Sequence, residues 1–294
     1  MKMIPPVVID DSMLVSSSIA ETDYPAWNAG TAYAADARCI RAALHSVYQR
    51  IAPGTTATPP EDDLVNWVRV GPTNRWAMFD QATGSRSSAS ASLSVTIAPV
   101  MVNSLALLDV SANTATVIMT SDAAEVFRKV VNLNNNANVF DFYSYCFEPI
   151  LLKSTAVVTD LPPYVNCQIT VELAGSGVVS LGTLAAGMIF DLGPTRYGVG
   201  LGGIDYSVKT TDVFGVTTVT ERPEASRMTV PFVVQNNRLD SVMRVLRDRR
   251  AKPSVWIGAK QFDSAVVYGY AKDRQLLIPY AQVSECSVTI EGLV

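Results

Sequence analysis

Short runs of Val, Ile, Leu and Thr, in which apolar and polar residues alternate, dominate the middle of the chain. Asn, Gly and Pro turns separate these runs, and this spacing is typical of antiparallel strands. The pattern therefore predicts an antiparallel β-sandwich. The expected strands are residues 93–100, 104–108, 114–120, 125–132, 140–147, 166–173 and 178–184.

One segment with helical periodicity interrupts the strands of the last hundred residues. Apolar residues at positions i, i+3, i+4 and i+7 predict an amphipathic helix over residues 237–250 with one buried stripe. The stripe consists of Leu239, Val242, Met243 and Leu246. Asn236 or Asn237 is suited to cap the start of the helix, and Pro253 ends it.

Hairpins and single strands surround this helix. The strands are expected at residues 202–207, 216–222, 231–235, 254–258, 265–270, 276–280 and 284–292. Turns at residues 212–215 and 272–274 are expected to close two hairpins. Together these elements predict an α+β domain whose core is the helical stripe packed on the sheet.

Residues 24–76 concentrate aromatic and turn residues, and they contain three of the four tryptophans. Four aromatic residues are candidates to stack on a sugar ring: Trp27, Tyr33, Trp67 and Trp76. In one interpretation such rings stand outward as flat platforms for pyranose rings. In the other they form the core of a module of about fifty residues, which has little else to bury. We expect Trp27 and Trp67 in that core, with Tyr24, Tyr33 and Trp76 nearer the surface.

Two segments divide the chain into domains. The first twenty-two residues are expected to be extended, because Pro5 and Pro6 stiffen the start and three serines loosen the end. Residues 80–92 are small and polar, as in a linker or long loop. The predicted domains are an extended N-terminal arm (1–22), an aromatic β module (23–79), a β-sandwich (80–195) and an α+β domain (196–294).

Composition narrows the classes of partner. A formal net charge of −4 and a pI near 5.1 give no basic footprint for nucleic acid. Hydrophobic residues make up 48% of the chain and charged residues 17%, against about 25% charged in typical globular domains. We therefore expect the protein to bury part of its apolar surface against partners. No apolar run is long enough for a membrane span, and the N-terminus lacks the apolar centre of a signal peptide, so synthesis in a cytoplasm is expected.

Catalytic and cofactor motifs are weak. His45 is the only histidine, which excludes a multi-histidine metal site, and we expect it to be a partly exposed strand residue. The four cysteines are far apart and are expected to be buried free thiols. Gly198, Gly200 and Gly203 spell G-x-G-x-x-G, but a strand-like segment follows where a nucleotide site needs a helix. The adjacent acids 61–63 are expected to be solvated and do not form a facing pair. No enzyme activity, cofactor or metal is predicted.

The order of residues in the aromatic module, from YPAWNAGTAY through HSVYQRI to VNWVRV, resembles the carbohydrate-binding modules of families five and twelve. Such modules occur on chitinases and on bacteriophage tail proteins. The runs NSLALLDVSANTATVIMTS and CQITVELAGSGVVSLGTLAAG are similar to galactose-binding jelly-roll domains. The strings GIDYS, RRAKPSVWIG and VVYGYAKD resemble distal-tail or baseplate proteins of tailed bacteriophages.

These resemblances imply a structural virion protein of a phage tail tip or baseplate, made in the host cytoplasm. Its partners would be other copies, in a homo-oligomeric ring, and neighbouring tail proteins, without nucleic acid or membrane insertion. The alternative is a virion-exposed protein that binds a host surface glycan for receptor recognition. An enzyme acting on carbohydrate is a third, weaker hypothesis.

Overall fold

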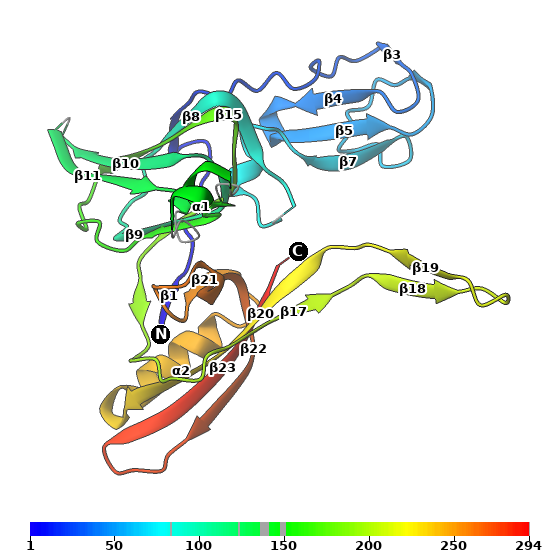
Figure 1. Ribbon diagram of the computed structural model, residues 1–294. Coiled ribbons are helices and arrows are strands. Elements are labelled where there is room, and N and C mark those ends of the chain that lie inside the picture. The colour runs from blue at the N-terminus through cyan, green and yellow to red at the C-terminus, as the bar shows by residue number, and fades with distance from the viewer. Residues whose placement is uncertain (83, 123, 136–140, 148–150, 294) are drawn as a thin grey trace.

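The computed structural model describes residues 1–82, 84–122, 124–135, 141–147 and 151–293 (Figure 1). The described chain is mainly β, and its strand pairs are antiparallel. Its longest helix is α2 (Leu239–Asp248), and a second helix, α1 (Phe142–Phe147), has six residues. The predicted mainly β fold with one clear helix is confirmed.

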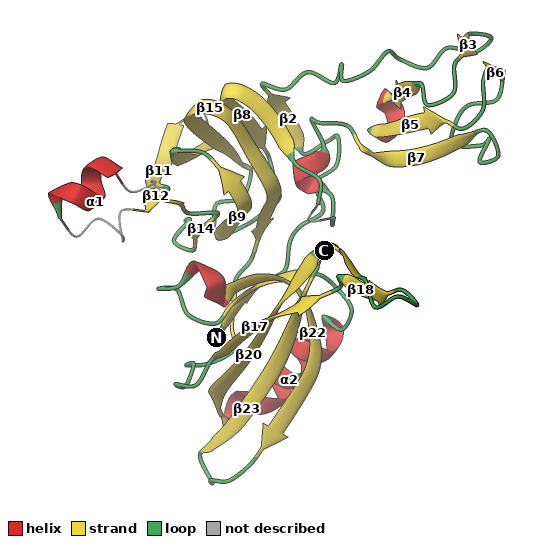
Figure 2. Cartoon of the chain, turned by 45° about the vertical axis from the view of Figure 1, so that its right-hand side comes forward, coloured by secondary structure: helices red, strands yellow, loops and turns green. Residues whose placement is uncertain are grey.

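The C-terminal sheet has seven strands and carries α2 against it (Figure 2). In sheet order these are β16 (Phe190–Asp191), β1 (Lys2–Ile4), β21 (Ser254–Ile257), β22 (Val266–Leu277), β23 (Val283–Gly292), β20 (Glu224–Gln235) and β17 (Gly200–Asp205). Alternate residues of β20 are buried, as expected for a strand with one face in a core. Val230 and Phe232 of β20 thereby pack with Val242 and Leu246 of the helix.

The middle domain is one sheet folded into two layers. Its strands are β2 (Leu14–Ser17), β8 (Ser87–Ile97), β9 (Ser104–Ser111), β10 (Thr114–Ser121), β11 (Ala124–Asn132), β14 (Thr155–Val158) and β15 (Cys167–Gly187). The 21-residue strand β15 joins the layers, because its first half pairs with β10 and its second half with β9. The pairing of β15 with β8 shifts register between Ala174 and Val178, so the two runs predicted as separate strands form one bent strand.

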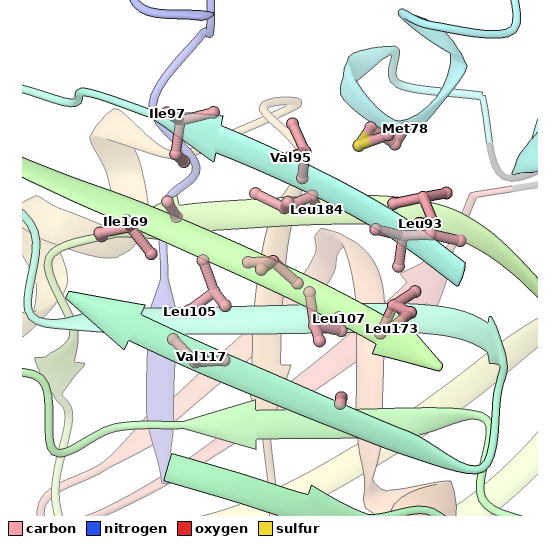
Figure 3. Packing of buried hydrophobic residues seen from close by; sticks show 14 of the residues in the cluster. Met78, Leu93, Val95, Ile97, Leu105, Leu107, Val117, Ile169, Leu173 and Leu184 are labelled. Carbon is pink, nitrogen blue, oxygen red and sulfur yellow. The ribbon is translucent and has the colours of Figure 1, made fainter. Parts of the chain in front are cut away.

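The core of the sandwich lies between these layers (Figure 3). Leu105 and Leu107 of β9 contribute to it together with Leu184 of β15. The intervening residues of β9, Ala106 and Leu108, face the opposite way and belong to another cluster. Both faces of this strand are therefore buried.

That other cluster joins the sandwich to the C-terminal sheet. It brings Ala106, Leu108 and Ala185 of the sandwich together with Val255 and Ile257 of β21. Ile4 and Tyr268 complete it. The two domains thus share an apolar interface.

The structure corrects the prediction of an extended arm at residues 1–22. Strand β1 lies inside the C-terminal sheet between β16 and β21, and β2 pairs with β8 at the edge of the sandwich. The intervening segment runs closely along the sandwich, since a Cβ at Gly187 would lie 2.1 Å from the carbonyl oxygen of Pro5. Prolines at positions 5 and 6 therefore mark a crossing between two domains.

The strand predicted at residues 140–147 is wrong where the structure describes it, because residues 142–147 form α1. Residue 140 lies outside the described residues. Tyr143 and Phe147 are four residues apart, and their ring centroids lie 4.9 Å apart. That contact is the i, i+4 neighbour relation of a helix and not the alternation of a strand. Next to this segment, β12 (Asn134–Asn135) pairs with β13 (Leu151–Leu152).

The turn predicted at residues 272–274 is also wrong, because β22 continues through it with a register shift between Ala271 and Asp273. Lys272 pairs with Glu291 across the sheet, and Arg274 donates to the carbonyl oxygen of Leu246 at 3.1 Å. These polar side chains belong to the part of β22 that pairs with β23 on one side and has its other edge exposed. The chain turns instead after Leu277, near Pro279.

The aromatic module contains a three-stranded sheet of β4 (Arg38–Arg41), β5 (Ser46–Arg50) and β7 (Trp67–Pro72). Strands β3 (Ala32–Tyr33) and β6 (Gly54–Thr55) form a second small pair. The predicted boundaries shift here in two ways. Trp76 and Met78 are buried in the core of the sandwich, and β8 begins at Ser87, inside the predicted linker.

Candidate functional site

Trp67 is the centre of the aromatic module. Its side chain is 1% exposed, and Tyr33 meets it edge-on with 5.0 Å between ring centroids. The guanidinium of Arg50 lies 5.1 Å from the Trp67 ring centroid, a cation–π contact. Cys39 and Tyr48 complete this small core. The expectation that Trp67 is a core residue is confirmed.

Trp27 packs at the border of that core and is covered by a charged pair. The Arg41 guanidinium lies 5.2 Å from the ring centroid of Trp27, and its Nη2 donates to Oε1 of Glu61 at 2.5 Å. Burial raises the pKa of Glu61, but the hydrogen bonds from Arg41, a backbone hydrogen bond and the positive charge of Arg41 together outweigh it and leave this pKa below its ordinary value. Glu61 is therefore a structural partner and not the solvated acid that was expected.

The remaining stacking candidates are not open platforms either. Trp76, which we expected near the surface, is buried in the core of the sandwich. Tyr33 is half-buried, and its hydroxyl accepts a hydrogen bond from the backbone nitrogen of Asn28 at 3.0 Å. Tyr24 faces the guanidinium of Arg38 at 5.6 Å. The structure thus brings Trp27, Tyr33 and Trp67 together as a core and separates Trp76 from them.

His45 lies where the aromatic module meets the sandwich. Its backbone is left-handed, with φ of 48°, at the end of the short 3-10 turn 42–44, and so it is not the expected strand residue. The ring stacks on Trp76 with 4.1 Å between centroids. Its Nδ1 lies 3.1 Å from Glu21, and its Nε2 lies 3.1 Å from Asp11.

Both ring nitrogens of His45 therefore face carboxylate oxygens. An ionised carboxylate only accepts hydrogen bonds, and a neutral imidazole has only one N–H to donate. Both carboxylates are satisfied together when both ring nitrogens carry protons. Glu21 also accepts from the hydroxyl of Thr73 at 2.8 Å, so one carboxylate links the histidine to the end of the module. His45 therefore works as a structural junction.

The helical stripe lies where the sequence placed it. Val242 and Leu246 are buried, and Leu239 and Met243 pack against the same cluster. The expected asparagine cap is absent from the described helix start. Asn236 instead donates to the carbonyl oxygens of Tyr280 and Ala281 and accepts from Ser284. This residue therefore ties the helix entry to the turn between β22 and β23.

A hairpin with every strand residue exposed extends from the C-terminal sheet (Figure 1). Strands β18 (Val208–Thr211) and β19 (Thr217–Thr220) pair only with each other, and each of their residues is exposed. From here on, the arm means residues 206–223 and not the N-terminal segment of residues 1–22. At its tip, Val213 is 93% and Phe214 87% exposed.

The tip turn has a defined geometry. Asp212 Oδ1 accepts from the backbone nitrogens of Phe214 and Val216 at 2.9 and 2.8 Å. Gly215 has a φ of +80°, which a side chain would disfavour. The predicted turn at residues 212–215 is confirmed. The tip therefore presents Val213 and Phe214 to the solvent on a fixed turn.

The other sequence candidates supply no catalytic arrangement. Gly200 and Gly203 lie in strand β17, so no helix follows the glycine motif. Cys39, Cys167 and Cys286 are buried, whereas Cys146 is exposed, which corrects the expectation for that residue. Burial raises the pKa of Cys39 to about 11, which makes this thiol a poor nucleophile at neutral pH.

Within the described residues, no group of three or more His, Cys, Asp or Glu side chains is arranged to hold a metal ion. No helix in the described part of the chain has the length and apolar character that a membrane crossing needs. Comparison with protein-family models gives no match to the chain, and comparison with curated proteins gives none either.

Proposed function

We propose that the protein is a non-enzymatic structural subunit that assembles with copies of itself and with neighbouring proteins in the tail tip or baseplate of a bacteriophage. The arm is the observation that carries this proposal. A two-stranded hairpin that packs on nothing is marginally stable in water, and an exposed apolar tip is typical of an interaction site. The phage tail is proposed as the location because the C-terminal sequence resembles distal-tail proteins.

A second feature supports assembly. Strand β17 is one of the two edge strands of the seven-stranded sheet, and β20 is its only neighbour in the described part of the chain. Its residues are mostly exposed. An edge strand with free backbone groups is a template for pairing with another chain. The arm continues directly from this edge, so the two features belong to one surface.

Glycan binding has less support. A sugar platform needs an aromatic face open to solvent, whereas Trp67 and Trp76 are buried and Arg41 covers Trp27. The aromatic module is better explained as a building block. Its position beyond the sandwich gives the subunit a third domain without adding a chemical site.

The arm can be removed without breaking the sheet. Asp205 of β17 lies opposite Glu224 of β20, so an Asn-Gly turn replacing residues 206–223 would close a two-residue hairpin. We expect the parent protein to sediment as an oligomer at concentrations on the order of tens of micromolar, where exposed apolar surface drives association. The shortened variant should keep its circular dichroism spectrum and sediment as a monomer.

Antibody labelling of phage particles that carry the protein provides the second test, with label expected at the tail tip. A parent protein that stays a 31.7 kDa monomer over the whole concentration range would refute assembly through the arm. Label on the capsid would refute the proposed location.

A further inference from the structure

The C-terminal domain has an apolar pocket of about 560 Å³ beside the start of β17. Its lining combines the exposed rings of Tyr197 and Phe262 and the half-exposed Leu201 with the buried Ala265. Pockets of this size and character are typical of sites that bind an apolar group. We call it the β17 pocket.

The arm tip of the same molecule lies far from this pocket. Strand β17 starts at the pocket with Gly200 and Leu201, and the arm continues beyond Asp205 away from the body of the protein (Figures 1 and 2). Twelve residues separate Leu201 from Val213, and an extended strand advances about 3.3 Å per residue. The tip therefore ends tens of ångströms from its own pocket, and any filling by the tip must come from another copy.

Tip and pocket are both mainly apolar, and each has one charged residue beside it, of opposite sign. The tip offers Val213 and Phe214 on a fixed turn, and the pocket offers aromatic and aliphatic walls. Asp212 is the only charged residue in the stretch 210–220. Among the described residues that line the pocket, Arg196 is the only charged one. The guanidinium of Arg196 pairs with Glu285 in the single chain, so a carboxylate at the tip would approach a guanidinium that already holds one carboxylate.

We infer that Phe214 and Val213 of one copy occupy the β17 pocket of a second copy, with Asp212 beside its Arg196. This inference rests on the proposed assembly function and names the contact that produces it. Tip and pocket are different surfaces, so each copy offers one free tip and one free pocket. A contact of this heterologous kind builds a closed ring or an open filament.

Two variants separate the two halves of the contact. Phe214→Ser removes the ring from the tip, and Phe262→Asp places a charge in the pocket wall; both residues are exposed, so both variants should fold. Each variant alone should sediment as a monomer. An equimolar mixture still offers one intact tip and one intact pocket, and it should give a one-to-one heterodimer. Val219→Ser, on the exposed side of the arm away from the tip, should keep the size of the parent.

Disulfide trapping identifies the contact directly. In a Cys146→Ser background, Val213→Cys in one copy and Gln261→Cys in the other should form a mixed disulfide under mild oxidation, and Val219→Cys should not. A parent-sized oligomer from both single variants, a mixture that stays monomeric, or a tip disulfide to a different surface would each overturn the inference while assembly stands. A monomeric parent would overturn the proposed function with it.

Discussion

At the residue scale, His45 joins three parts of the chain by contacts of different kinds. Its ring stacks on Trp76 of the sandwich core and faces the carboxylates of Glu21 and Asp11. Asparagine tolerates the left-handed backbone of this position but removes the stack and both ring contacts. We expect His45→Asn to lower the free energy of unfolding by about 1–3 kcal/mol, because the nearly buried Glu21 loses a hydrogen-bond partner. Chemical denaturation followed by tryptophan fluorescence measures the change.

Asp11 provides the matched control, because it contacts the same ring from the solvent. Its side chain is 76% exposed, against 13% for Glu21. Asp11→Asn should therefore change the free energy of unfolding by less than about 0.5 kcal/mol. Equal losses of stability in the Asp11 and His45 variants would show that exposure does not decide the strength of these contacts. No loss in either variant would contradict the role of His45 as a structural junction.

Glu61 gives the aromatic module a dependence on pH. Its pKa in the folded protein lies below the ordinary value of 4.5, because burial, which raises it, is outweighed by the hydrogen bonds and charge of Arg41 together with a backbone hydrogen bond. A lowered folded pKa stabilises the fold above the unfolded pKa, and this contribution disappears as the pH falls through the folded value. Glu61→Gln should thus cost up to about 1 kcal/mol at neutral pH. The difference from the parent should vanish once the pH has fallen through the lowered folded pKa, and a difference that persists there would identify a packing effect at Trp27.

At the scale of elements, helix α2 holds one face of the C-terminal sheet. Leu246 is 1% exposed within the cluster that also contains Phe232. Leu246→Asp would bury an unpaired charge there and should lower the free energy of unfolding by several kcal/mol, on the order expected for such changes. Arg244→Ala, on the exposed side of the same helix, should change it by about 0.5 kcal/mol or less. Thermal unfolding of both variants tests the orientation of the stripe, and equal stability would contradict it.

Elements with their own periodic signal were predictable from sequence. Helix α2 and strands β9, β10 and β23 lie within a few residues of their expected bounds. Strand β1 was not predictable, because its partner β21 is some 250 residues away in sequence, and nothing local in Lys2–Ile4 indicates the pairing. The polar run at 272–274 was misread as a turn because its partners, Glu291 and Leu246, are likewise distant in sequence.

The candidate site was less predictable than the fold. Aromatic residues in a small module have two physical uses, and only burial distinguishes a core ring such as Trp67 from a platform. Trp76 was assigned to the wrong domain, since the sequence carries no sign that the chain enters the sandwich core there. The arm was visible as an alternating Thr/Val hairpin, but its lack of packing is a property of three dimensions.

At the scale of the whole molecule, strands that are buried on both faces explain part of the unusual composition. Residues of β9 face the sandwich core and the domain interface in alternation, and β21 places Trp256 in one cluster and Val255 and Ile257 in another. Such strands need apolar residues at every position. Part of the apolar excess is therefore internal, and the arm is one of several places where large apolar side chains remain exposed.

The shared interface predicts how the molecule unfolds. The sandwich and the C-terminal sheet bury Ala106 and Ile257 against each other, and β1 and β2 tie the same two domains through one short segment. We expect calorimetry to record one transition for these two domains together and a separate one for the aromatic module. Ala106→Arg would force a long charged side chain into the interface and should split the joint transition into two.

Val130→Arg introduces the same residue on β11, where the side chain of Val130 is 61% exposed. Because the guanidinium remains in water there, this variant should keep the transition pattern of the parent. Splitting in both variants would mean that an added arginine disturbs the sandwich itself. A joint transition that survives Ala106→Arg would mean that the connection through β1 and β2, and not the apolar interface, makes the two domains unfold together.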